Sequence, residues 1–144
     1  MTETGTGWLD VCGRATYVRL TTFRRDGTPV PTPVWVVRDG GSLLVITGAA
    51  AGKTKRLRHT PRVLIAPSDM RGRVAADVED VEATATVSSS PAELERLSTL
   101  LKAKYGVQYA VMRLADRVRA RGADASVQIR ILPVDGVMDE TAAG

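Results

Sequence analysis

The chain has 144 residues, of which 44% are hydrophobic and 25% are charged, a balance typical of a globular protein that excludes a disordered chain. The single cysteine, Cys12, excludes an internal disulfide and a multi-cysteine zinc cluster, and we expect a reducing, cytoplasmic compartment. No stretch approaches the ~18 apolar residues of a membrane span. We predict a single domain over residues 1–144, with frayed ends at residues 1–10 and 139–144.

The net charge of +4 is unevenly distributed along the chain. Residues 53–73 contain seven basic side chains and one acid, Asp69, whereas the remainder of the chain is mildly acidic. A short basic window of this kind indicates an anion held at a defined place, rather than general attraction to a polyanion.

The first half of the chain has the alternating pattern of β-strands. Residues 17–23 alternate in polarity, and the Asp-Gly pair at 26–27 predicts a hairpin turn to a second strand over residues 30–37. After a turn at residues 39–41, residues 43–47 are apolar throughout. We therefore predict a three-stranded antiparallel meander whose third strand is buried on both faces.

The second expected strand contains Pro31 and Pro33, and proline has no amide hydrogen to donate to a neighbouring strand. We expect this strand to be irregular or to face a ligand on one side. The remaining expected elements are helices over residues 52–59, 91–105 and 109–121 and strands over residues 62–66, 81–88 and 127–131.

The helix over residues 91–105 has the clearest sequence signals. Ser90 and Glu93 have the spacing of a capping box, leucines form an apolar stripe, and Gly106 follows as a stop. Antiparallel strands combined with about three helices favour a mainly β fold, a β-barrel with helices, over a doubly wound sheet.

Residues 48–54 stand where a nucleotide-binding P-loop would, between a buried strand and a helix. Only three residues separate the two glycines, however, where a P-loop requires four, and this excludes a triphosphatase. Backbone amides at the helix start still form an anion pocket with Lys53, to which Lys55 or Arg56 adds a second cation. The sequence thus predicts a phosphate-bearing ligand, the alternative being a solvated charged helix face.

Several segments resemble the F420-dependent branch of the pyridoxamine 5′-phosphate oxidase-like superfamily. The resemblance lies in residues 17–35, 45–47, 52–58, 61–67 and 127–133. It implies a split β-barrel of the FMN-binding type, assembled as a homodimer with two cofactor sites at the subunit interface. It also implies an oxidoreductase that uses reduced coenzyme F420 to transfer a hydride to a conjugated small molecule, whose identity the sequence does not indicate.

The resemblance further implies a set of cofactor-binding residues. These are Thr32, Pro33, Val34, Trp35, Thr47, Lys53, Lys55, Arg56 and Arg71. The first four lie along the cofactor ring, Thr47 lies near the ring and ribityl chain, and Lys53 with Lys55 or Arg56 holds the phosphate. We assign no catalytic residue and no metal ligand, because the cofactor supplies the chemistry of hydride transfer. The single histidine, His59, is expected at the surface.

The choice of cofactor depends on the start of the helix. Flavin-using relatives have a Ser-Arg-Lys run there, whereas this chain has Ala51-Gly52-Lys53. A wide positive window also suits the phosphodiester and polyglutamate tail of F420 better than the single phosphate of FMN, which is the alternative cofactor.

Two further function classes remain as alternatives. One is a non-catalytic cofactor-binding protein on the same fold. The other is a nucleic-acid-binding protein, which the basic window favours but an aromatic content of 4% disfavours, because few rings are available for base stacking.

Overall fold

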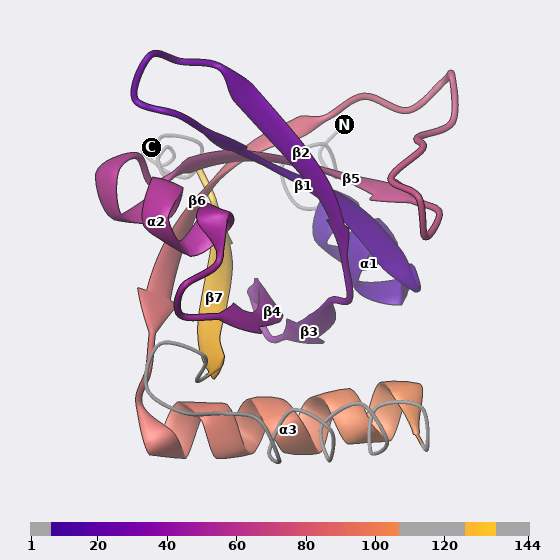
Figure 1. Cartoon of the computed structure of the whole chain (residues 1–144). Helices are drawn as coiled ribbons and strands as arrows, with labels where there is room; N and C mark the ends of the chain where they lie inside the picture. The colour runs from indigo at the N-terminus through magenta and orange to yellow at the C-terminus, as the bar shows by residue number, and fades with distance from the viewer. Residues whose placement is uncertain (1–6, 107–125, 135–144) are drawn as a thin grey trace, which may run out of the picture.

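The computed structural model describes residues 7–106 and 126–134. These residues form one seven-stranded antiparallel sheet with the strand order β2-β1-β5-β6-β7-β4-β3, accompanied by three helices (Figure 1). The strands are β1 (Tyr17–Phe23), β2 (Pro29–Val34), β3 (Val37–Asp39), β4 (Ser42–Gly48), β5 (Arg62–Ser68), β6 (Val81–Ser88) and β7 (Ser126–Pro133). The helices are α1 (Gly7–Arg14), α2 (Gly52–His59) and α3 (Pro91–Tyr105).

The predicted fold class is confirmed: the chain is mainly β, and its curled antiparallel sheet and helices match the split β-barrel. No helix among the described residues is long and apolar enough to cross a membrane. The helix predicted over residues 109–121 lies outside the described residues, as do residues 1–6 and 135–144.

The hairpin between β1 and β2 forms as the sequence predicts. Gly27 adopts a φ of 91°, and the Asp26 carboxylate accepts a hydrogen bond of 3.0 Å from the Thr28 amide. The three-stranded meander, however, is wrong, because β2 and β3 lie at opposite edges of the sheet. The chain leaves β2 after Val34, and β4 then pairs with the distant β7 and with β3.

The barrel core contains one face of the long strands, including Leu20, Val45 and Ile65. Leu9 and Cys12 of α1 join this core, so the predicted frayed end is wrong for residues 7–10. Their spacing of three places both side chains on one helix face, which packs on the sheet. Burial raises the pKa of the Cys12 thiol to about 12, so the thiol is protonated and unreactive at neutral pH.

Helix α3 packs against the outer face of the sheet (Figure 1). Leu97 and Leu101 are fully buried against Leu44 of β4, so β4 is buried on both faces, as predicted. Ser90 caps the helix by accepting a 3.4 Å hydrogen bond from the Glu93 amide. The Glu93 carboxylate accepts a 3.0 Å bond from the Gln128 side chain instead of completing the capping box.

Helix α3 covers Gln128 of β7 at this contact and leaves it 2% exposed.

The last turn of α3 attaches the helix to the loops around β2. The Lys104 ammonium donates to the carbonyl oxygens of Gly13, Ala15 and Val36 at 2.9, 2.7 and 2.7 Å. The Tyr105 hydroxyl donates to the Thr16 carbonyl at 2.7 Å. These bonds join α3 to the end of α1 and to the connection that follows β2.

Candidate functional site

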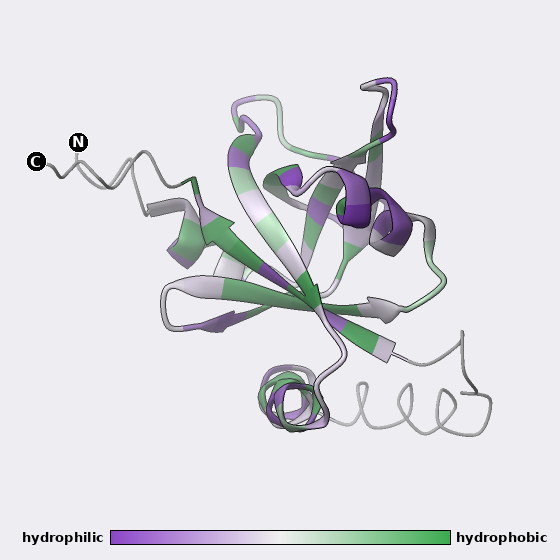
Figure 2. Cartoon of the chain, turned by 90° about the vertical axis from the view of Figure 1, so that its left-hand side faces the viewer, coloured by the Kyte–Doolittle hydropathy of each residue, from purple (hydrophilic) through white to green (hydrophobic). Residues whose placement is uncertain are grey.

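Helix α2 is held at the end of β4 by two buried side chains. Leu57 belongs to the barrel core, and the Thr54 hydroxyl donates a 2.7 Å hydrogen bond to the Gly48 carbonyl. With Thr54 and Leu57 facing the barrel, the charged side chains of the helix are directed away from the core. Figure 2, in which α2 faces the viewer, shows this helix as predominantly hydrophilic.

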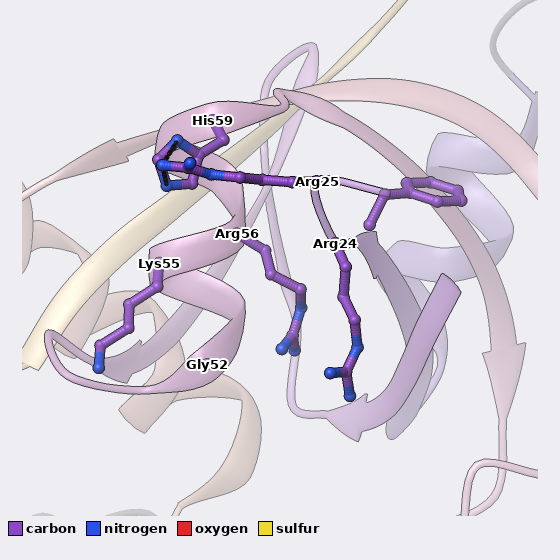
Figure 3. Close-up of a pocket in the computed structure, with 7 residues that line it drawn as sticks. Arg24, Arg25, Gly52, Lys55, Arg56 and His59 are labelled. Carbon is purple, nitrogen blue, oxygen red and sulfur yellow. Dashed lines mark hydrogen bonds between the residues drawn. The ribbon is translucent and has the colours of Figure 1, made fainter. Parts of the chain in front are cut away.

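A pocket of about 340 Å³ lies between α2 and the β1–β2 turn (Figure 3). It is lined by Phe23, Arg24, Arg25, Gly52, Lys55, Arg56 and His59. Four of these residues are cationic and none is acidic. The pocket is therefore suited to an anionic ligand.

Arg56 lies at the centre of this arrangement. Its Nε donates a 2.6 Å hydrogen bond to the Thr22 hydroxyl, which orients the guanidinium over Gly52. A Cβ at Gly52 would stand 2.8 Å from Arg56 Nη1, so glycine leaves the room that the guanidinium occupies. Figure 3 shows the guanidinium groups of Arg24 and Arg56 pointing in the same direction. Burial lowers the Arg56 pKa, and the nearby charge of Arg24 lowers it further.

Lys53 does not line the pocket, but it is half-buried next to Arg56. Burial lowers its pKa, and repulsion from Arg56 adds to the effect. We call Arg24, Arg25, Lys53, Lys55 and Arg56 the cationic cluster. Within residues 7–106 and 126–134, no member forms an ion pair with an acid. A bound anion would relieve this repulsion, so the cluster fits a phosphate group.

His59 is exposed at the rim of the pocket, as predicted for a surface residue. Its Nε2 lies 3.1 Å from Arg25 Nη2, and a neutral imidazole accepts a hydrogen bond from that donor. The two side chains together form one wall of the pocket (Figure 3).

Strand β2 is a regular edge strand, so the irregular course expected from its prolines is wrong. All six residues of β2 pair in register with β1, and Pro29, Pro31 and Pro33 are the exposed ones that alternate with partly buried residues. Because proline has no amide hydrogen, the hydrogen bonds to β1 come from the intervening residues. The carbonyl oxygens of the prolines therefore point to the free edge, which offers acceptors without donors.

The structure places six of the nine predicted site residues in two separate groups. Lys53, Lys55 and Arg56 lie together at the start of α2, whereas Arg71 lies in a second pocket of about 120 Å³. That second pocket is lined by Arg19, Pro31, Thr32, Pro33, Arg71 and Gly72. Thr32 and Pro33 are thus placed with Arg71 and not with the cationic cluster.

The other three predicted residues lie apart from both pockets. Thr47 is half-buried near the end of β4, beside the turn that leads into α2. Val34 packs against the barrel core. Trp35 stacks on Tyr105 with ring centroids 4.2 Å apart and an interplanar angle of 5°, so one face of the indole is covered by α3.

Phe23, Arg24 and Arg25 line the first pocket but are absent from the residues predicted from the sequence. The available signal was the Arg-Arg pair just before the Asp-Gly turn. Only the packing of α2 on β1 shows that this turn lies beside the helix start. In the part of the chain that the structure describes, no group of His, Cys, Asp or Glu is arranged to hold a metal ion.

A sequence model of the family described as pyridoxamine 5′-phosphate oxidase matches residues 9–136. The fold is similar to that of an F420 reductase, with 21% identity, a TM-score of 0.59, and coverage of 90% of this chain and 94% of that chain. It is also similar to HutZ, the heme storage protein from Vibrio cholerae, with 15% identity, a TM-score of 0.63, and coverage of 90% and 87%.

A third similar structure is a pyridoxamine 5′-phosphate oxidase-related, FMN-binding protein from Nostoc punctiforme. It has 17% identity, a TM-score of 0.53, and coverage of 92% of this chain and 78% of that chain. At these identities the three likenesses show the fold alone. No curated protein matches the sequence.

Proposed function

The chain belongs to the pyridoxamine 5′-phosphate oxidase family, a family with a flavin-binding fold, and from this we propose that it is an oxidoreductase that uses reduced coenzyme F420. The observation that carries the proposal is the cationic cluster, in which half-buried Lys53 and Arg56 lie close together without an acidic partner among the described residues. Such a cluster favours an extended anion, and F420 carries a phosphodiester and a polyglutamate tail.

In this proposal Lys53, Lys55 and Arg56 hold the phosphodiester. Arg24 and Arg25 from the β1–β2 turn extend the positive surface toward the acidic tail. Thr47 lies on the segment that joins β4 to α2, between these cations and the sheet.

The cofactor ring is assigned to the free edge of β2, along residues 32–35. Carbonyl oxygens directed to that edge accept hydrogen bonds from ring N–H groups. Trp35 contributes through its backbone in this assignment, since its ring stacks on Tyr105. When bound, the reduced deazaflavin supplies the hydride, and the protein supplies orientation and exclusion of water.

The proposal includes a two-fold homodimer with a cofactor site at each side of the interface, and a small conjugated molecule as the hydride acceptor. A cytoplasmic location belongs to it as well, because a single buried thiol suits a reducing compartment. The similarity to an F420 reductase supports the choice of cofactor. The similarities to an FMN-binding protein and to the heme storage protein HutZ indicate FMN and heme as the competing ligands.

Side-by-side titration of the purified protein with F420, FMN and heme tests the proposal. We expect F420 to bind most tightly and to raise the melting temperature progressively, with the logarithm of its concentration once it exceeds the Kd. Tight binding of FMN or heme without binding of F420 would overturn the cofactor assignment. Binding of F420 without oxidation of its reduced form by any quinone or tetrapyrrole acceptor would instead indicate a non-catalytic cofactor-binding protein.

A further inference from the structure

The second pocket lies on the face of β1 and β2 that is turned away from the barrel core. Arg19 follows Val18 and precedes Leu20, both of which are buried in the core, so its side chain points to the opposite face. The pocket of about 120 Å³ has room for one small polar group and not for a cofactor ring.

The loop that covers this pocket is held in a fixed shape. The Asp69 carboxylate accepts hydrogen bonds from the amides of Arg71 and Arg73 at 2.8 and 2.9 Å. Gly72 between them has a φ of 84°, and its Cα side faces the ring of Pro33. The amide hydrogen bonds, that of Arg73 first, lower the Asp69 pKa, so the carboxylate stays ionised and keeps the loop against β2.

Arg19 is held in the wall of the pocket by Asp80. Its Nη2 pairs with Asp80 at 2.9 Å, but its Nε is buried and has no hydrogen-bond partner among the described residues. Asp80 Oδ1 is likewise buried without a partner in that part of the chain. Because its Nε is closed off from solvent, Arg19 faces the pocket through the remainder of its side chain, which is 29% exposed and carries the positive charge.

The local charge favours an anionic oxygen over a neutral one. Arg19 and Arg71 line the pocket and no described acidic residue does, and the Asp80 carboxylate pairs with Arg19. Asp69 is engaged by the loop amides and Asp80 by Arg19, so Arg71 is the cation available to a ligand.

We propose that this pocket binds an oxyanion of the substrate, a carboxylate or a phosphate, between Arg19 and Arg71. The substrate assignment rests on the proposed function, because Thr32 and Pro33 line the pocket and also belong to the edge assigned to the cofactor ring. A substrate anchored here by its anionic group would have its conjugated part beside β2. The proposed hydride acceptor is thus an anionic small molecule.

The test uses the full chain without cofactor, at constant ionic strength, with sodium phosphate and sodium succinate as separate probes. The readout is the ¹⁵N-resolved Nε–H resonance of Arg19. We expect at least one probe to shift this resonance in a saturable manner. The probe that binds with the higher affinity shows which oxyanion the pocket prefers. Arg71→Gln should weaken that binding about tenfold, because it removes a charge-assisted contact and keeps the backbone amide that Asp69 holds.

Two controls separate this pocket from the cationic cluster. Arg73→Gln, on the same loop but outside the pocket, should leave probe affinity within about twofold. Arg56→Gln should also leave the Arg19 shift unchanged, even where it abolishes F420 binding, so the two proposals fail independently. If neither probe moves the Arg19 resonance, water alone fills the pocket. If the shift is lost in Arg56→Gln but kept in Arg71→Gln, the anion binds elsewhere. Either result overturns the proposal.

Discussion

Arg56 is the residue on which the cationic cluster depends most. It is fixed by Thr22, packed over Gly52, and close to both Arg24 and Lys53. We expect Arg56→Gln to weaken F420 binding by about ten- to a hundredfold, the loss of one charge-assisted contact of about 1.5–3 kcal/mol. Titration followed by F420 fluorescence measures this change.

Arg58 provides the matched control for that substitution, since it is exposed on the same helix and does not line the pocket. Arg58→Gln should leave F420 affinity nearly unchanged. Equal losses in the two variants would show that α2 attracts anions only through its overall charge, without a defined phosphate site.

Lys53 gives the site a pH dependence. Burial lowers its pKa below the ordinary value of 10.5, so the folded chain holds this proton less tightly than the unfolded chain does. Without ligand, the contribution of Lys53 to folding stability therefore rises with pH between the lowered pKa and 10.5. A bound phosphate stabilises the charged ammonium of Lys53 and therefore raises this lowered pKa.

F420 affinity should accordingly fall as the pH rises through the lowered Lys53 pKa, and calorimetry at several alkaline pH values measures the trend. In Lys53→Gln the affinity should be lower at neutral pH and much less dependent on pH. An identical alkaline decline in that variant would assign the titration to another group.

At the scale of elements, the last turn of α3 is attached to neighbouring segments through the charged group of Lys104. The Lys104 ammonium satisfies three carbonyl oxygens that belong to the end of α1 and the connection after β2. Lys104→Met would keep the length of the side chain and leave those carbonyls unpaired. We expect a loss of about 2–4 kcal/mol in the free energy of unfolding, measured by urea denaturation.

Lys102→Met is the control, because Lys102 is exposed on the same helix. Its free energy of unfolding should change by less than about 0.5 kcal/mol. A similar small effect for Lys104→Met would mean that water replaces the ammonium at the three carbonyls at little cost.

At the scale of the whole molecule, the edges of the sheet bear on assembly. The prolines of β2 remove amide donors from one edge, which prevents a second chain from adding there as a strand. We expect a homodimer formed through side chains and loops, burying more than ~1,200 Å² in total.

Sedimentation equilibrium should give twice the chain mass of 15.4 kDa at micromolar concentration. A monomer under those conditions would contradict both the dimer and a cofactor site shared between subunits.

Local physics was enough to predict much of this protein. The φ angle that Gly27 needs, the alternation over residues 17–20 and the leucine stripe of α3 are each set by neighbours in sequence, and the structure contains all three. Over residues 21–23 the alternation is lost, because all three side chains are buried. The basic window likewise identified Lys55 and Arg56, because a run of charges at a helix start is visible without any tertiary contact.

Tertiary structure decided what distant segments do to one another. The sequence of β4 shows that it is buried but not that its partner is β7, because pairing depends on burying a shared core and not on proximity in sequence. The same reason explains why Arg24 and Arg25 join the site only when α2 packs on β1, and why Arg71 is placed opposite Arg19 by the shape of its loop. Residue chemistry determined which side chains carry a positive charge, and packing decided how they are divided between the cationic cluster and the second pocket.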